Sequence, residues 1–212
     1  MSTSRRYVSP VRAQQADATR RAILDAAVRL FVEPGYAATS VAAVARAAGV
    51  STQTVYNGFA TKPALLKAAY DVTLAGDDRE VPFAERPEVR AVYELADPRD
   101  FVRGYASLGR TVLDRLGPLM LQVAAGAAAG HTDLVALQRT TDDERAAGTL
   151  MVVRRVEELG SLAPALTLEQ ARDRIWTLNS VQVWHLLTAG RGWSGDEYEE
   201  WIGVAMCDAV LA

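Results

Sequence analysis

The chain has 212 residues, half of them hydrophobic and 23% charged, and its formal net charge is −3. This length allows one large domain or a small domain joined to a larger one, and it can bury a core without disulfides. The single cysteine, Cys207, excludes an internal disulfide framework and a cysteine-based zinc cluster, and it is typical of a cytoplasmic protein.

The sequence predicts neither a membrane span nor a secretion signal. The longest uncharged stretches, residues 116–132 and 175–190, are shorter than the roughly 20 apolar residues that a span requires. The N-terminus contains arginines but lacks the apolar core of a secretion signal. We therefore expect no membrane partner.

The net charge conceals a strong asymmetry along the chain. Residues 1–70 contain nine Lys and Arg against three Asp and Glu, a balance of +6, whereas the remainder contains 14 basic and 23 acidic residues, a balance of −9. A basic head on an acidic body indicates a module that binds a polyanion, joined to a part that does not touch it.

Apolar residues recur every three or four positions through most of the chain, which predicts an all-α protein of about nine helices. In chain order, the first part is predicted to begin with a flexible basic arm over 1–16 and a helix over 17–33, which ends at Pro34 and Gly35. Two short helices are expected next, over 40–48 with Thr39 as its N-cap and over 52–59 with Ser51 as its N-cap. A fourth helix is expected from Lys62 to about 75.

The second part begins with a stretch rich in proline and charge, residues 76–98, which is interpreted as a linker or an irregular helix. Further along the chain, a helix over 98–116 is expected to break at Gly117 and Pro118. A helix of small residues is expected to follow to 129, and then a long helix to 159. Capping boxes at Thr167/Gln170 and Ser194/Glu197 predict the starts of two more helices, over 168–189 and 196–211.

The segment 39–59 has the pattern of a helix-turn-helix, because two short helices meet at Gly49 with their apolar positions facing inward. In this motif the second helix presents its N-terminal half to base edges in the major groove. That helix carries hydrogen-bonding side chains and no acid, which suits a surface that faces phosphate charge. These side chains are Thr52, Gln53, Thr54, Tyr56 and Asn57.

A set of residues in a recognisable order and spacing extends over about a quarter of the chain. They are Ile23 to Ala27, Leu30, Phe31, Gly35, Tyr36, Thr39 to Val41, Ala47 to Ser51, Thr54 to Tyr56, Phe59, Lys62 and Ala64 to Leu66. In these residues the chain resembles the DNA-binding domain of the TetR family of transcriptional regulators. The resemblance implies a three-helix DNA-binding domain over 17–62 and a helical domain over 63–212 that binds an effector and forms the dimer.

Carried over position by position, the resemblance implies two kinds of DNA contact, one to phosphates and one to bases. The implied contacts are Thr39, Thr54, Tyr56 and Lys62 on phosphates and Thr52, Gln53 and Asn57 on bases, with the cap residue Ser51 included in the DNA-binding set.

Two positions depart from the family pattern. Gln53 replaces a small residue and could read adenine, and Gly58 removes a common phosphate contact or marks the end of the helix. Arg5, Arg6 and Arg12 could enter the minor groove or lie in a loose tail.

The resemblance also implies that the acidic body encloses a small apolar or aromatic effector. Each polar or aromatic candidate could equally be an ordinary core or interface residue. The candidates are Tyr105, Gln122, His131, Gln138, Trp176, Asn179 and Gln182.

The predicted helix over 168–189 is apolar on two sides, which is typical of a buried helix. Paired with the helix over 196–211, it suits a four-helix interface between two copies of the chain, with aromatic anchors. Trp193 could instead fill the turn between these helices. The interface candidates are Val183, Trp184, Leu187, Trp193 and Trp201.

The residues needed for catalysis are missing, because two isolated histidines and one cysteine offer no nucleophile and base pair. We expect no enzyme activity, cofactor or metal. The leading hypothesis is a cytoplasmic, homodimeric repressor that a small effector releases from a palindromic operator. The alternatives are an activator, a regulator without an effector, and a small-molecule-binding protein with a non-functional DNA head.

Overall fold

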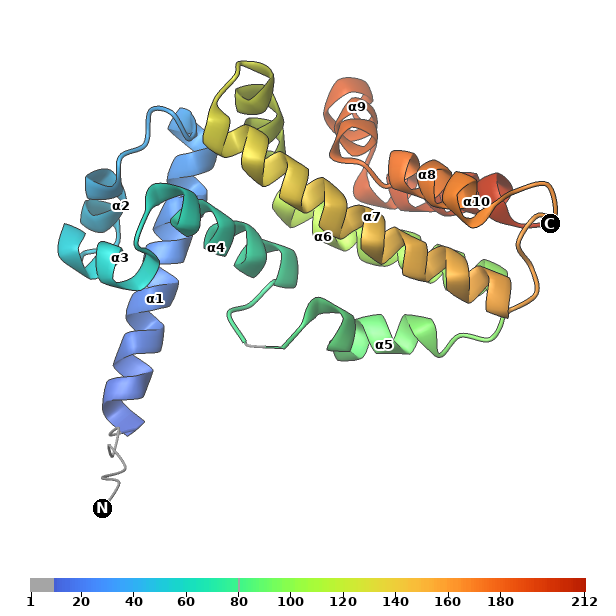
Figure 1. Ribbon diagram of the computed structural model, residues 1–212, viewed down its shortest axis with the longest axis horizontal. Coiled ribbons are helices and arrows are strands. Elements are labelled where there is room, and N and C mark those ends of the chain that lie inside the picture. The colour runs from blue at the N-terminus through green and yellow to red at the C-terminus, as the bar shows by residue number, and fades with distance from the viewer. Residues whose placement is uncertain (1–9, 80) are drawn as a thin grey trace. The chain divides into compact units, whose positions relative to one another are not determined.

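A computed structural model describes residues 10–79 and 81–212, and these residues form helices joined by turns, which confirms the predicted all-α fold (Figure 1). The chain divides into two compact units, Met1–Val72 and Thr73–Ala212. Within the described residues, no helix combines the length and the apolar character that crossing a membrane requires.

The first unit is a small helical domain with an apolar core. Its core side chains are almost fully buried, among them Leu24, Phe31, Val44, Val55 and Leu65. Its elements are α1 (Pro10–Leu30), a π-helical turn (Phe31–Gly35), α2 (Val41–Ala47), α3 (Thr52–Phe59) and most of α4 (Lys62–Ala75).

The first helix begins at Pro10, earlier than the predicted start at 17, so the second half of the predicted flexible arm is helical. Residues 10–16 are rich in Ala, Gln and Arg, which favour helix, and proline is tolerated in a first turn. Arg12 therefore lies in α1, whereas Arg5 and Arg6 lie outside the described residues.

The N-cap predicted for the second helix is wrong by one residue. Ser40 caps α2, because its hydroxyl accepts a hydrogen bond from the Ala43 N–H at 3.1 Å. Thr39 is only 3% exposed, and its hydroxyl donates toward the carbonyl oxygens of Leu30 at 2.6 Å and Gly35 at 2.9 Å. Thr39 therefore closes the turn that follows α1.

A tight turn joins α3 to α4. Ala60 has φ 55° and ψ −50°, and the Thr61 N–H donates to the Phe59 carbonyl at 2.5 Å. This is a γ-turn with a positive φ at its centre, a conformation in which a Cβ atom is strained. The connection between these helices therefore stores strain at one alanine.

The second unit is a bundle around one apolar core, and Figure 1 shows α6 and α7 running side by side within it. The core includes Phe101, Val153, Ile175, Tyr198 and Met206, all fully buried. The elements are a 3₁₀ turn (Phe83–Glu85), α5 (Pro87–Tyr93), α6 (Pro98–Ala128), α7 (Thr132–Glu158), α8 (Leu168–Leu178), α9 (Val181–Arg191) and α10 (Gly195–Val210).

The predicted break at Gly117 and Pro118 is wrong, because α6 continues through both residues. Proline removes one helical hydrogen bond, but Leu116, Leu119 and Val123 are buried on either side of it, so packing maintains the helix. Gly117 instead allows a close approach, since a Cβ atom there would lie 2.5 Å from the ring of Trp184.

The predicted single helix over 168–189 is wrong as well, because it divides into α8 and α9 at Asn179 and Ser180. Arg145 of α7 donates to the carbonyl oxygens of Trp176 at 2.6 Å and Asn179 at 3.0 Å, which meets the last acceptors of α8. Ser180 then caps α9 by accepting from the Val183 N–H. Both predicted capping boxes, at Thr167 and Ser194, are confirmed.

The C-terminal end of α4, from Thr73 on, belongs to the second unit and is held by side chains of that unit. Arg115 of α6 donates to the carbonyl oxygens of Thr73 at 2.9 Å and Leu74 at 2.6 Å. The stretch predicted as a linker follows, and it is anchored by Arg86, which is 5% exposed and donates two hydrogen bonds to Asp77, at 2.7 and 3.0 Å. The hydrogen bonds from Arg86, and then the backbone N–H of Arg79, hold the pKa of the Asp77 carboxyl far below its ordinary value.

We expect Ala60→Gly to raise the free energy of unfolding by about 1 kcal/mol, because glycine adopts a positive φ without strain. Ala64→Gly, at an exposed position inside α4, is the matched control and should lower it by about 1 kcal/mol. Urea unfolding followed by circular dichroism measures both. Equal destabilisation by the two substitutions would contradict a strained turn.

We expect Asp77→Asn to lower Tm at neutral pH, because the buried Arg86 would lose its charged partner. Since folding lowers the pKa of Asp77, the stabilisation is complete above the ordinary aspartate pKa of about 4 and is lost as the pH falls through the lower native value. The Tm difference from wild type should therefore be constant down to about pH 5 and shrink below about pH 4.

Asp71→Asn is the control for this pH series, because Asp71 pairs with Lys67 on the surface and such pairs contribute little. A Tm difference for Asp77→Asn that widened in acid would count against the assigned pair.

Candidate functional site

The helix α3 begins at a local cap and presents one face to solvent. The Ser51 hydroxyl accepts from the Thr54 N–H at 3.0 Å and lies 2.8 Å from the Thr54 hydroxyl. Val55 and Phe59 are buried, four residues apart, so the opposite face of the helix is exposed. The helix continues through Gly58, which does not end it.

Four of the predicted DNA-contacting residues come together on that exposed face. Gln53 and Asn57 are joined by a hydrogen bond of 2.8 Å from the Gln53 side-chain amide to the Asn57 side-chain oxygen. Thr52 is exposed beside them, and Tyr56 is 45% exposed. The face therefore combines donors, acceptors and an aromatic ring without an acidic group.

The other predicted contacts have partners within the domain. Thr54 is half-buried in the cap of α3, and Thr39 is buried in the turn after α1, where its hydroxyl bonds to backbone carbonyls of its own domain. Lys62 is half-buried, and its ammonium group donates to the Tyr36 carbonyl at 2.5 Å and lies 4.0 Å from the centre of the Tyr36 ring. Lys62 therefore holds the start of α4 against the segment before α2.

One basic side chain beside α3 was not singled out from the sequence. The Arg20 guanidinium lies 4.9 Å from the centre of the Phe59 ring, and Arg20 itself is exposed. No local pattern indicates this, because the two residues are far apart in the chain and the fold alone brings α1 and α3 together. A cation thus lies next to the polar face of α3.

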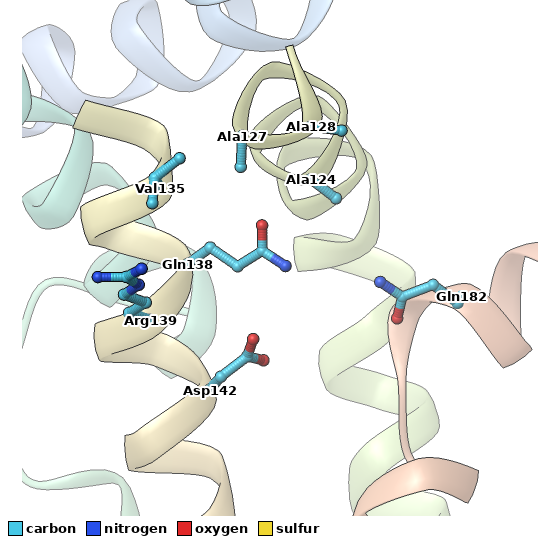
Figure 2. Close-up of a pocket in the computed structure, with 8 residues that line it drawn as sticks. All are labelled: Ala124, Ala127, Ala128, Val135, Gln138, Arg139, Asp142 and Gln182. Atoms are coloured by element: carbon cyan, nitrogen blue, oxygen red, sulfur yellow. The ribbon is translucent and has the colours of Figure 1, made fainter. Parts of the chain in front are cut away.

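The second unit contains an open hollow of about 540 Å³, shown in Figure 2. Gln138 and Gln182 line it, as two of the predicted effector-contacting residues. Asp142 also lines it and is not among the effector contacts predicted from the sequence, although its i,i+4 spacing from Gln138 places it one helical turn further on the same face. The lining residues are Ala124, Ala127, Ala128, Val135, Gln138, Arg139, Asp142 and Gln182.

The remaining effector candidates do not line this hollow. Asn179 donates to the Tyr105 hydroxyl at 3.1 Å, and the Trp176 ring lies 4.0 Å from the Arg145 guanidinium. These three candidates therefore surround the corner between α8 and α9. Gln122 and His131 are exposed elsewhere on the unit.

The predicted dimer residues divide into two groups. Val183, Trp184 and Leu187 pack against the core of their own unit, and the Trp184 indole donates to Asp114 at 3.1 Å. Trp193 packs edge-on against Trp201, with 5.9 Å between ring centres.

The exposed apolar side chains of α9 and α10 are Leu186 at 64%, Trp201 at 38% and Val204 at 38%. The expectation that the helix is buried all round is wrong within the single chain, because α9 has no fully buried residue.

Comparison with known proteins matches the first unit to a family of regulators. Residues 23–69 match the family model described as bacterial regulatory proteins, tetR family. The HTH-type transcriptional regulator AcrR of Shigella flexneri is 38% identical over 60 residues, which are 28% of this chain and 28% of that protein. The match thus spans just over a quarter of the relative.

Two solved structures resemble nearly the whole chain. A TetR family transcription regulator from Marinobacter aquaeolei VT8 has a TM-score of 0.65 and 25% identity, with 94% of this chain and 98% of that one covered. A transcriptional regulator from Saccharomonospora viridis in complex with choline has a TM-score of 0.67 and 22% identity, with 91% and 97% covered. All three of these proteins are described as transcriptional regulators.

Proposed function

We propose that the N-terminal domain of this chain, which matches the tetR family model over residues 23–69, binds DNA and that the protein is a homodimeric repressor in the cytoplasm. In this proposal two copies bind a palindromic operator, and a small effector in the second unit releases them. The observation that carries it is the exposed, acid-free face of α3, where Gln53 and Asn57 form one hydrogen-bonded pair.

The chemistry of that face favours base recognition over simple charge attraction. A glutamine side chain can pair with the N6 and N7 atoms of adenine in the major groove. The hydrogen bond that Gln53 donates to Asn57 holds the Gln53 amide in one orientation, so fewer rotamers need to be ordered when DNA binds. Ser51, Thr52, Thr54 and Tyr56 are proposed to contact the backbone and bases around this pair, and Lys62 to contact a phosphate.

The proposed dimer rests on apolar surface that the single chain leaves open. Leu186 of α9 and Trp201 and Val204 of α10 are exposed, although large apolar side chains are more stable out of water. Aromatic residues are enriched at protein interfaces, and Trp193 packs against Trp201, which is one of these exposed residues. A two-fold dimer would supply the two DNA-binding domains that a palindrome requires.

The proposed effector site is the hollow lined by Gln138, Asp142 and Gln182. Its volume of about 540 Å³ is in the range of sites that hold small organic molecules. The similar regulator from Saccharomonospora viridis was solved in complex with choline, which supports a ligand-binding role for this fold. Repression would end when the effector stabilises a state with lower affinity for DNA.

We expect Gln53→Ala to relax the preference at one base pair of each half-site and to weaken operator binding by about tenfold. Lys62→Ala should weaken binding to every sequence and lower the slope of log K against log[salt] by about one. The operator would be selected from random DNA, and anisotropy titrations over a salt series measure both effects.

Lys67→Ala is the matched control for these titrations, because Lys67 lies in the same helix and pairs with Asp71. Since Lys62 also contacts Tyr36, the Tm of each variant is measured alongside. If Gln53→Ala and Lys62→Ala changed the sequence preference alike, the sorting into base and phosphate contacts would be incorrect.

We expect Leu186→Asp to convert the dimer into monomers, because a buried carboxylate at an apolar interface is costly. Met151→Asp is the control, since Met151 is a 54% exposed apolar residue of α7 and not of α9 or α10. Sedimentation velocity measures the mass of each. A Leu186→Asp protein that sediments as the wild-type dimer would refute the proposed interface.

A further inference from the structure

The hollow presents one carboxylate and two carboxamides above a floor of methyl groups, and we propose that it binds a small aliphatic amine in its ammonium form. This inference rests on the proposed function, because it names the chemical class of the effector. It differs from the apolar or aromatic molecule that the family resemblance implies. The residues that carry it are Gln138 and Asp142 of α7 and Gln182 of α9.

The three polar side chains converge from two helices. Figure 2 shows Gln138 and Asp142, one helical turn apart on α7, pointing toward the gap that separates α7 from α6 and α9. Gln182, in the first turn of α9, lies across that gap. Arg139 also lines the hollow but points to the other side of α7. Asp142 is thus the charged side chain that lies with the two carboxamides in this view.

The hydrogen-bonding capacity of these groups matches an ammonium group. A carboxylate and the two amide oxygens are acceptors, and an alkylammonium group has three N–H donors and no acceptor. Asp142 has one contact to Arg145, at 3.4 Å, which is longer than the 2.7–2.9 Å of a strong charge-assisted hydrogen bond. A carboxylate has about four acceptor positions, so Asp142 can accept from a second cation.

The apolar lining of the hollow suits the hydrocarbon part of such a molecule. Ala124, Ala127 and Ala128 at the end of α6 and Val135 of α7 present methyl groups. A short alkyl chain would leave water on contact with these methyl groups, whereas the ammonium group would bind at Asp142 and keep part of its hydration.

The same carboxylate connects the hollow to the corner between α8 and α9. Arg145, the cation that contacts Asp142, donates to the carbonyl oxygens of Trp176 and Asn179 where α8 ends. An ammonium group bound to Asp142 would share this carboxylate with Arg145. Binding would thereby act on the residue that ends α8 and precedes α9, the helix that carries the exposed Leu186.

The test uses the full chain and compares butylammonium with 1-butanol, which has the same alkyl length and no charge. By isothermal titration calorimetry, wild type should bind butylammonium at least about tenfold more tightly than 1-butanol, and Asp142→Asn should lose this preference. Asp143→Asn, at an exposed neighbouring acid that does not line the hollow, is the control and should bind as wild type.

A second variant tests the same idea by gain of affinity. Gln138→Glu adds a carboxylate on the same face of α7 and should tighten butylammonium binding, with no effect on 1-butanol. Equal binding of the two probes by wild type, or unchanged butylammonium binding by both Asp142→Asn and Gln138→Glu, would overturn the proposal.

The DNA assay separates this inference from the proposed function. If wild type binds its operator and the calorimetry shows no preference for butylammonium, the ammonium site is refuted and the regulator proposal stands. If no palindromic site is selected, the repressor proposal is refuted, and the calorimetry still decides whether the hollow binds ammonium.

Discussion

The last carbonyl groups of a helix need hydrogen-bond donors, and in this chain several helices are ended by donors that lie elsewhere in the sequence. The Thr39 hydroxyl bonds to the Leu30 carbonyl after α1, Arg115 bonds to the last turn of α4, and Arg145 bonds to the last carbonyls of α8. Each of these donors fixes where one helix stops and where the next begins. The positions of the exposed face of α3 and of the hollow both depend on these junctions.

In the first unit, the proposed DNA-binding face of α3 depends on both local and distant contacts. Ser51 starts α3 through a bond to its own third residue, which a sequence pattern can encode. Lys62 then ties the start of α4 to the Tyr36 carbonyl, and Arg20 of α1 lies on the ring of Phe59. The polar face of α3 is thus presented from a domain whose helix ends are fixed on both sides, as base recognition requires.

In the second unit, the corner between α8 and α9 decides which surfaces face solvent. The division at Asn179 gives α9 its own direction, so Trp184 packs toward Gly117 of α6 while Leu186 remains 64% exposed. The same corner places Gln182 across from Gln138, which forms one wall of the hollow. The proposed dimer surface and the proposed effector site therefore both depend on Arg145, whose hydrogen bonds end α8.

The sequence alone determined the all-α class, the helix-turn-helix, its likeness to the TetR family and the caps at Ser51, Thr167 and Ser194, because these depend on residues within a few positions of one another. Tertiary structure decided the rest. It carried α6 through Pro118 by packing, and it divided α8 from α9 by hydrogen bonds from Arg145, more than thirty residues away. Gln138 and Gln182 could be proposed from their composition as polar groups in apolar helices, but their meeting with Asp142 in one hollow required the fold.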